Sequence, residues 1–252
     1  MNDPGHKIQG ARPRRSVERP AGPSSRLQHD FVIKVCGITK LEDAVLSVKA
    51  GANALGFNFY PGSPRFIEPA EAAKIIEELP KPTLNIGVVV IQPSLAGASQ
   101  ERLEGGECVL GELGLNTRDL IRAGFGAIQI HGASEERQIP DLGIRTFVAT
   151  SPQAAGEFSD YEIVIDTSWG SGTVADWDLI LRLLDRPYIL SGGLTPANVE
   201  EALQKLHPDG VDVCSGVEEV PGTKNREKLE RFLAIVRRFA DDFRSNSRSK
   251  ES

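Results

Sequence analysis

The chain has 252 residues, of which 40% are hydrophobic and 25% are charged, and its formal net charge at neutral pH is −6. This length and composition suit one large globular domain with a substantial core. The net negative charge disfavours a general attraction to nucleic acid or to an anionic membrane surface. Three widely spaced cysteines, Cys36, Cys108 and Cys214, indicate neither a disulfide framework nor a metal-binding cluster, so a reducing, cytoplasmic location is expected.

Residues 1–30 are rich in Pro, Gly, Ser and Arg and contain few apolar side chains. Such a segment cannot bury enough surface to offset the entropy lost on ordering, so we predict a disordered extension. It lacks the apolar segment of a secretory signal, and its three acidic residues disfavour the alternative of an organellar transit peptide. No run of about 18 apolar residues predicts a membrane span. Residues 244–252 are predicted to be a frayed polar tail, which leaves 31–243 as the folded domain.

The first predicted strand covers residues 31–35, a short apolar run rich in β-branched side chains, and it ends at Cys36. Residues 39–42 have the Thr-x-x-Glu spacing of a capping box, in which the Thr39 hydroxyl caps the start of a helix. Apolar side chains then recur at helical spacing and form one stripe: Leu41, Ala44, Val45 and Val48. The pattern predicts a strand, a turn that bears a cysteine, and a helix.

Strand-like and helix-like segments alternate along the rest of the chain. Seven more strands are predicted, at residues 53–59, 84–91, 127–131, 145–149, 161–166, 187–191 and 210–214. The clearest helices are predicted at 69–79, from Pro196 onward with Thr195 as the capping residue, and at 225–243. Strands that alternate with helices predict a parallel sheet, and eight such units close a (β/α)8 TIM barrel, which typically takes about 250 residues. An open, doubly wound sheet is the structural alternative.

Two regions fit the repeat badly. Residues 92–116 are rich in Gly and only weakly periodic, so they predict either an inserted loop or a loosely specified helix. Residues 133–143 are too short and too polar for a full barrel helix. Loops on one face of a barrel tolerate such irregularity.

The carboxyl ends of the strands form the active-site rim of a barrel, and chemically versatile residues gather there. Cys36 follows the first strand, and Asp166 ends the sixth. Each residue also has a structural interpretation. A cysteine at a strand end is often a small buried side chain, and an aspartate there often caps the next helix. A thiol beside a helix N-terminus can have a lowered pKa, and a carboxyl group across the rim can donate a proton. The two residues are therefore a candidate base and acid.

Glycine-bearing turns follow the last two predicted strands. One contains Ser191, Gly192 and Gly193, and the other contains Ser215 and Gly216. Glycines allow backbone N–H groups to approach an anion closely, and this pair of loops is the frequent phosphate site of barrels. We predict a phosphate site there, although plain tight turns also favour glycine. A third loop, with Gly170, Ser171 and Gly172, follows the sixth strand and is expected to fold over the same ligand.

Six segments appear in an order and at a spacing that suit the barrel. They are KVCGIT (34–39), GFNFY (56–60) with SPR (63–65), QIHG (129–132), DT (166–167) with GSG (170–172) and DW (176–177), LSGGLTPANV (190–199) and VDVCSGVE (211–218). Together they make the chain, over roughly residues 31–240, similar to the phosphoribosylanthranilate isomerases of tryptophan biosynthesis.

The resemblance implies a (β/α)8 barrel without a cofactor or metal that catalyses an Amadori rearrangement of N-(5-phosphoribosyl)anthranilate. Motif by motif, it implies Cys36 as general base, Asp166 as general acid and Arg65 as the ligand of the anthranilate carboxylate. His131 and Asp212 also lie in matching motifs, where a role in substrate binding and a purely structural role are both open. The expected partner is a small phosphosugar, with no nucleic acid or membrane, and the chain is expected to be a monomer or a homodimer.

Some features depart from that family. Residues 92–116 are longer than usual there, the helix after His131 is shortened, and Trp169 and Thr173 replace a common glycine and lysine in the loop after the sixth strand. Two other functions stay open. A pentose-phosphate epimerase would share the phosphate loops but would need metal-binding histidines at several strand ends, where only His131 stands. A noncatalytic phosphosugar-binding barrel would not need both Cys36 and Asp166.

Overall fold

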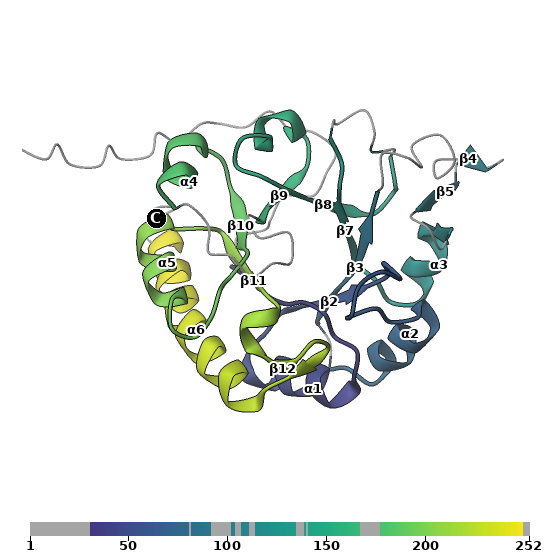
Figure 1. Ribbon diagram of the computed structural model, residues 1–252, viewed down its shortest axis with the longest axis horizontal. Helices are drawn as coiled ribbons and strands as arrows, with labels where there is room; N and C mark the ends of the chain where they lie inside the picture. Colours follow the sequence, from purple (N-terminus) through teal and green to yellow (C-terminus); the bar gives the residue numbers. More distant parts are fainter. Residues whose placement is uncertain are drawn as a thin grey trace, which may run out of the picture.

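The computed structural model describes residues 31–80, 82–91, 102–103, 107–110, 114–134, 139, 141–166 and 177–248; the predicted extension at 1–30 lies outside these ranges. Eight parallel strands close into a barrel in the order β1-β11-β10-β9-β8-β7-β3-β2 (Figure 1). They are β1 (Val32–Val35), β2 (Ala54–Asn58), β3 (Leu84–Val90), β7 (Ala127–His131), β8 (Arg145–Thr150), β9 (Glu162–Asp166), β10 (Tyr188–Ser191) and β11 (Gly210–Val213). The predicted (β/α)8 barrel is confirmed, and the open sheet is excluded because β1 pairs with both β2 and β11.

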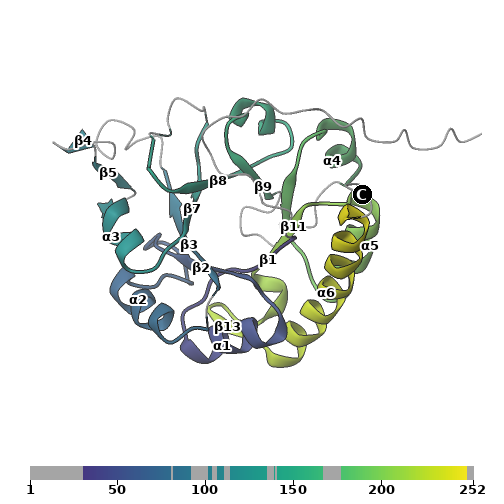
Figure 2. The same ribbon diagram turned by 180° about the vertical axis from the view of Figure 1, so that it is seen from behind.

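Helices surround the barrel on its outside (Figures 1 and 2). They are α1 (Leu41–Ala50), α2 (Pro69–Glu77), α3 (Thr117–Arg122), α4 (Trp177–Leu183), α5 (Val199–Leu206) and α6 (Arg226–Arg248). A short 3-10 helix, η3 (Ala155–Phe158), takes the place of a full helix between β8 and β9. Between β7 and β8, where no full barrel helix is predicted, the described residues contain no helix. None of the helices described is both long enough and apolar enough to cross a membrane.

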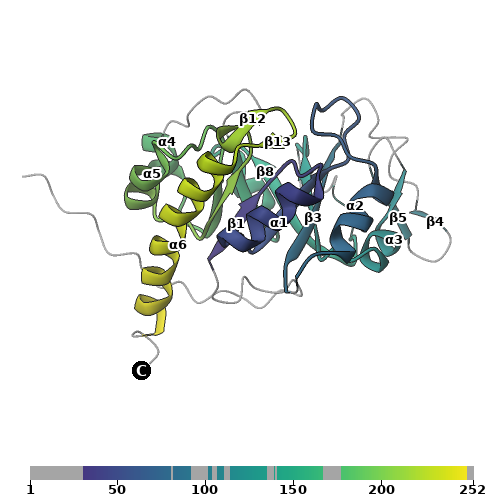
Figure 3. The same cartoon turned by 90° about the horizontal axis from the view of Figure 1, so that it is seen from below.

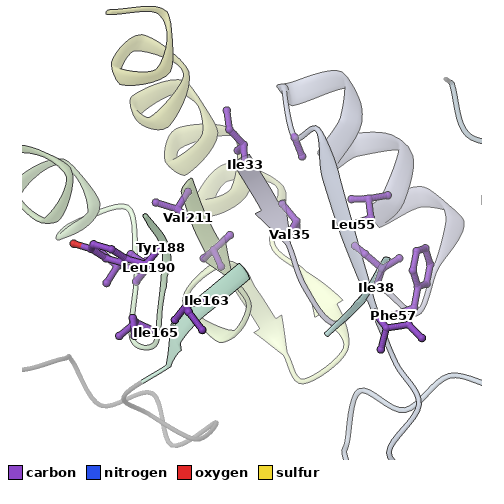
Figure 4. Packing of buried hydrophobic residues seen from close by; sticks show 14 of the residues in the cluster. Ile33, Val35, Ile38, Leu55, Phe57, Ile163, Ile165, Tyr188, Leu190 and Val211 are labelled. Carbon is purple, nitrogen blue, oxygen red and sulfur yellow. The ribbon is translucent and has the colours of Figure 1, made fainter. Parts of the chain in front are cut away.

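The core has two layers because neighbouring side chains of a strand point to opposite faces. Inside the barrel, Val32, Ile86, Phe147 and Val164 belong to one apolar cluster. The larger cluster lies between the strands and the helices, and Figure 4 labels ten of its residues: Ile33, Val35, Ile38, Leu55, Phe57, Ile163, Ile165, Tyr188, Leu190 and Val211. This packing on both faces explains why the strands are almost continuously apolar.

Helix α6 continues to Arg248, beyond the predicted end at residue 243. Figure 3 shows this end of the helix extending past the barrel. Phe31 anchors the helix, because its ring makes edge contacts with Phe239 and Phe243 at centroid distances of 5.7 Å. Residues 244–248 contain no Gly or Pro, so nothing local ends a helix that is already anchored.

Two predicted helix starts need correction. The capping box is wrong, since α1 has Lys40 as its N-cap without a side-chain bond, and the Thr39 hydroxyl instead donates to Gly222 O at 2.6 Å. Gly222 belongs to the turn between β12 (Glu218–Val220) and β13 (Thr223–Lys224), so a tertiary contact outcompetes the local cap. The predicted helix start at Pro196 with Thr195 as the cap is also wrong, because α5 begins at Val199 with Asn198 as its N-cap, and the Thr195 hydroxyl accepts from Ala197 N at 3.2 Å in the turn before the helix.

The described part of 92–116 contains no helix. It forms three short antiparallel strands, β4 (Arg102–Leu103), β5 (Glu107–Leu110) and β6 (Leu115–Asn116). The alternative of a loosely specified helix is therefore wrong for these residues. The Asn116 side chain then accepts from Arg118 N at 2.8 Å and caps α3.

Candidate functional site

A pocket lies at the carboxyl ends of the barrel strands. It is lined by Arg65, Asp166, Ser191, Gly192, Gly193, Leu194, Asp212, Cys214, Ser215 and Gly216. The fold thus brings together predicted site residues from four separate segments of the chain. Cys36 and His131 lie beside these residues at the ends of β1 and β7, whereas Gly170, Ser171 and Gly172 fall outside the described residues.

Cys36 sits directly after β1, where its N–H donates to Val213 O at 2.8 Å. A Cβ atom at Gly56 would lie 2.7 Å from the Cys36 Sγ, so the neighbouring strand must carry a glycine there. A side-chain hydrogen bond with Cys214 lowers the pKa of Cys36 well below its usual value, and the charges of Lys34 and Lys224 add to this effect against the opposing effect of burial. This environment favours a reactive thiolate over an inert buried thiol.

Lys34 and Asp212 form an ion pair inside the barrel. They occupy paired positions on β1 and β11, and Lys34 Nζ lies 2.6 Å from Asp212 Oδ2. Burial raises the pKa of Asp212 to about 7, although Lys34 opposes this shift. The second carboxylate oxygen of Asp212 is buried without a hydrogen-bond partner, so it can accept one from a ligand. Sequence reasoning gave Lys34 no role, although a lysine within an apolar strand is a signal that it has a buried partner.

Asp166 ends β9 and lines the pocket, and two strands, β10 and β11, lie between β9 and β1, which Cys36 follows. His131 ends β7, and its Nε2 lies 2.9 Å from Gln129 Nε2. Burial lowers the pKa of His131, and the nearby Asp166 carboxylate opposes this shift. His131 is therefore a neutral hydrogen-bonding group at neutral pH, close to the proposed acid.

Arg65 is held by a carboxylate that sequence reasoning did not assign. Its Nε and Nη2 donate to both oxygens of Glu218, the shortest distance being 2.7 Å. Glu218 also accepts from Lys224 Nζ at 3.0 Å and from Gly222 N at 3.3 Å. Burial opposes ionisation of Glu218, but Arg65 and Lys224 outweigh it and lower the pKa of the carboxyl group. The sequence indicated Glu218 only through its position as the last residue of the segment 211–218.

The two glycine-bearing turns lie next to each other on the pocket wall. Gly192 and Gly193 have φ angles of +90° and +64°, which favour glycine. A Cβ atom at Gly216 would lie 1.8 Å from Leu194 O, so the backbones of the two turns touch. Asn198 supports the first turn by donating from Nδ2 to Gly193 O at 2.9 Å. The two turns therefore present backbone at one place, as a phosphate site requires.

Among the residues described, no three His, Cys, Asp or Glu side chains are grouped as a bound metal ion would require.

Comparisons with known proteins point to one family. A family model for N-(5'-phosphoribosyl)anthranilate isomerase matches residues 117–234. The isomerase of Thermotoga maritima is 37% identical over 215 residues, which cover 80% of this chain and 96% of that protein. The isomerase of Magnetococcus marinus is 36% identical over 221 residues, with 83% and 96% covered.

Solved structures agree with this assignment. The crystal structure of phosphoribosylanthranilate isomerase from Thermotoga maritima has a TM-score of 0.68 and 32% identity, covering 82% of this chain and 98% of that one. A crystal structure of a phosphoribosylanthranilate isomerase in complex with reduced 1-(o-carboxyphenylamino)-1-deoxyribulose 5-phosphate has a TM-score of 0.66, with the same identity and coverage. The chain therefore belongs to the N-(5'-phosphoribosyl)anthranilate isomerase family.

Proposed function

We propose that this protein catalyses the Amadori rearrangement of N-(5-phosphoribosyl)anthranilate to 1-(2-carboxyphenylamino)-1-deoxyribulose 5-phosphate in tryptophan biosynthesis. The observation that carries the proposal is the arrangement of Cys36 and Asp166. They stand across the rim of one barrel, beside a pocket whose far wall is made of two touching glycine-bearing turns. A base, an acid and an anion site are the groups that this reaction needs.

The substrate has an anion at each end, and the pocket offers a binding group for each. The turns with Ser191, Gly192 and Gly193 and with Ser215 and Gly216 would bind the phosphate. Arg65 would bind the anthranilate carboxylate, because its Glu218 contacts use Nε and Nη2 and leave further N–H donors on the guanidinium. The loop with Gly170, Ser171 and Gly172 is proposed to cover the bound substrate.

The chemistry proceeds in two proton transfers. Asp166, as the general acid, gives a proton to the ring oxygen, and the furanose opens to a Schiff base. Cys36, as the thiolate, takes the C2′ proton and forms an enolamine that tautomerises to the ketone. The buried free oxygen of Asp212 would accept a hydrogen bond from a sugar hydroxyl. Neutral His131 would act as a hydrogen-bonding partner at the same end of the pocket.

A steady-state assay tests the proposal. Anthranilate, phosphoribosyl pyrophosphate and a phosphoribosyltransferase generate the substrate in situ, and the loss of anthranilate-type fluorescence reports turnover by the purified protein. We expect turnover without added metal or cofactor. Tight binding of a reduced product analogue without turnover would instead indicate a phosphosugar-binding protein.

The protein is further proposed to act in the cytoplasm on a small phosphosugar, without nucleic acid or membrane, as a monomer or homodimer. One solved relative from Thermotoga maritima is described as a dimeric isomerase. Sedimentation velocity at assay concentrations distinguishes the two oligomeric states.

A further inference from the structure

Cys36 and Cys214 stand side by side at the ends of neighbouring strands. β1 and β11 are paired with Lys34 opposite Asp212 and Val35 opposite Val213. One residue further along, Cys36 N donates to Val213 O at 2.8 Å, which places Cys36 beside Cys214, and a side-chain hydrogen bond between the two thiols shifts the pKa of each. Both are free thiols. The proposed base therefore has a second thiol as a direct partner.

The hydrogen bond between the two thiols acts on them in opposite directions. Their mutual hydrogen bond lowers the pKa of Cys36, whereas the same bond, together with burial, raises the pKa of Cys214 well above its usual value. With Cys36 as the proposed base, Cys214 is the thiol that keeps its proton. In this state Cys214 is the hydrogen-bond donor and the Cys36 sulfur is the acceptor.

Glu218 gives the Cys214 proton a second acceptor. Cys214 Sγ lies 3.8 Å from Glu218 Oε1, which Lys224 and Gly222 N also bind. Once Cys36 has taken the substrate proton, the Cys214 S–H can turn to this carboxylate. Cys214 thus keeps the same proton throughout the cycle, and the only proton that Cys36 exchanges with the substrate is the one on C2′.

We propose that Cys214 is a positioning residue that donates its S–H to Cys36 and so holds Cys36 as the thiolate that accepts the substrate proton. This inference rests on the proposed function. Other titratable groups also act on Cys36, and they are retained when Cys214 is replaced: Lys34 on β1, Asp212 on β11, Lys224 on β13, His131 on β7 and Arg65 in the loop after β2.

Two matched variants test the proposal, Cys214→Ala, which removes the donor, and Cys214→Ser, which retains an O–H donor. Alkylation of Cys36 by iodoacetamide, followed by peptide mass spectrometry from pH 5 to 10, measures its titration independently of turnover. We expect the midpoint in Cys214→Ala to rise by about one pH unit or more, and kcat/KM on the acid limb to fall about tenfold while the plateau at high pH is retained. Serine should restore most of both.

Equal alkylation midpoints in wild type and Cys214→Ala would overturn the inference, as would an equal loss of kcat/KM at every pH. If alanine prevents folding, Cys214→Val fills the space without a donor and must show the same shift. The outcome is separable from the proposed function. If Cys36→Ala retains turnover while the alkylation midpoint of Cys36 still differs between wild type and Cys214→Ala, only the assignment of Cys36 as base fails.

Discussion

Lys34 and Asp212 lie 2.6 Å apart inside the barrel, at paired positions of β1 and β11, and both side chains are buried. The positive charge of Lys34 lies near Cys36 and lowers the pKa of its thiol. Asp212 contributes a carboxylate to the pocket, and one oxygen of this carboxylate is buried without a hydrogen-bond partner. The ion pair therefore serves both the barrel interior and the proposed chemistry.

Replacement of Lys34 by Met should destabilise the fold strongly, because it leaves Asp212 buried without its partner. We expect a loss of about 3 to 5 kcal/mol in the free energy of unfolding, measured by urea denaturation. Lys74→Met is the matched control, since Lys74 pairs with Glu71 on the exposed face of α2, and its loss should cost about 0.5 kcal/mol or less. Similar effects of the two variants would contradict a buried ion pair.

The stability of the protein should depend on pH through Asp212. Because burial raises the folded-state pKa to about 7, above the usual value of 3.8, the folded state holds more protons between these values. The contribution of Asp212 to stability is therefore fully present below about pH 4 and is lost as the pH rises through 7. The Asp212→Asn variant should lack this decline in unfolding free energy between pH 4 and 8. Parallel curves for the two proteins would show that Asp212 is already ionised across this range.

The proposed acid and base should be essential for turnover but not for folding. We expect Cys36→Ala and Asp166→Asn each to lower kcat by about 100-fold or more, the range of general acid and base catalysis, with unchanged circular dichroism. Asp160→Asn, at an exposed site just before β9, is the control and should keep wild-type kcat. Full activity in either site variant would refute the proposed mechanism.

Arg65 should contribute to recognition of one end of the substrate. Loss of a charge-assisted hydrogen bond costs about 1.5 to 3 kcal/mol, so Arg65→Ala should lower kcat/KM about 10- to 100-fold, with Arg122→Ala as an exposed control. The sharper comparison uses N-(5-phosphoribosyl)aniline, which lacks the carboxylate. Arg65→Ala should affect this analogue much less, and an equal loss on both compounds would assign Arg65 a structural role through Glu218.

Contact between the two phosphate turns can be tested with a single methyl group. Gly216→Ala would place Cβ 1.8 Å from Leu194 O, so the turns must separate. We expect KM to rise and the unfolding free energy to fall by about 1 to 3 kcal/mol. Gly156→Ala, where nothing lies within 4 Å of the new atom, should change both by little. Inhibition by inorganic phosphate, which should weaken only in Gly216→Ala, links the effect to the anion site.

The local pattern of apolar residues was enough to predict the strands. The strand predicted at 127–131 is Ala127–His131, and that predicted at 145–149 is one residue longer. A strand that is buried on both faces is apolar along almost its whole length, so the strand can be predicted from its own residues. The prediction of a cap at Thr39 failed because its hydroxyl binds Gly222, 183 residues away in sequence, and such a contact leaves no local trace.

The sequence by itself determined the barrel, the family resemblance and the identity of Cys36, Asp166 and Arg65 as candidates, because these depend on local periodicity and on short motifs. Only the tertiary structure decided what surrounds them. Three interactions join segments that are far apart in the chain: the ion pair of Lys34 with Asp212, the hydrogen bonds from Arg65 to Glu218, and the interaction of Cys36 with Cys214. The ionisation of a thiol depends on distances and burial, and these exist only once β1 and β11 have closed the barrel.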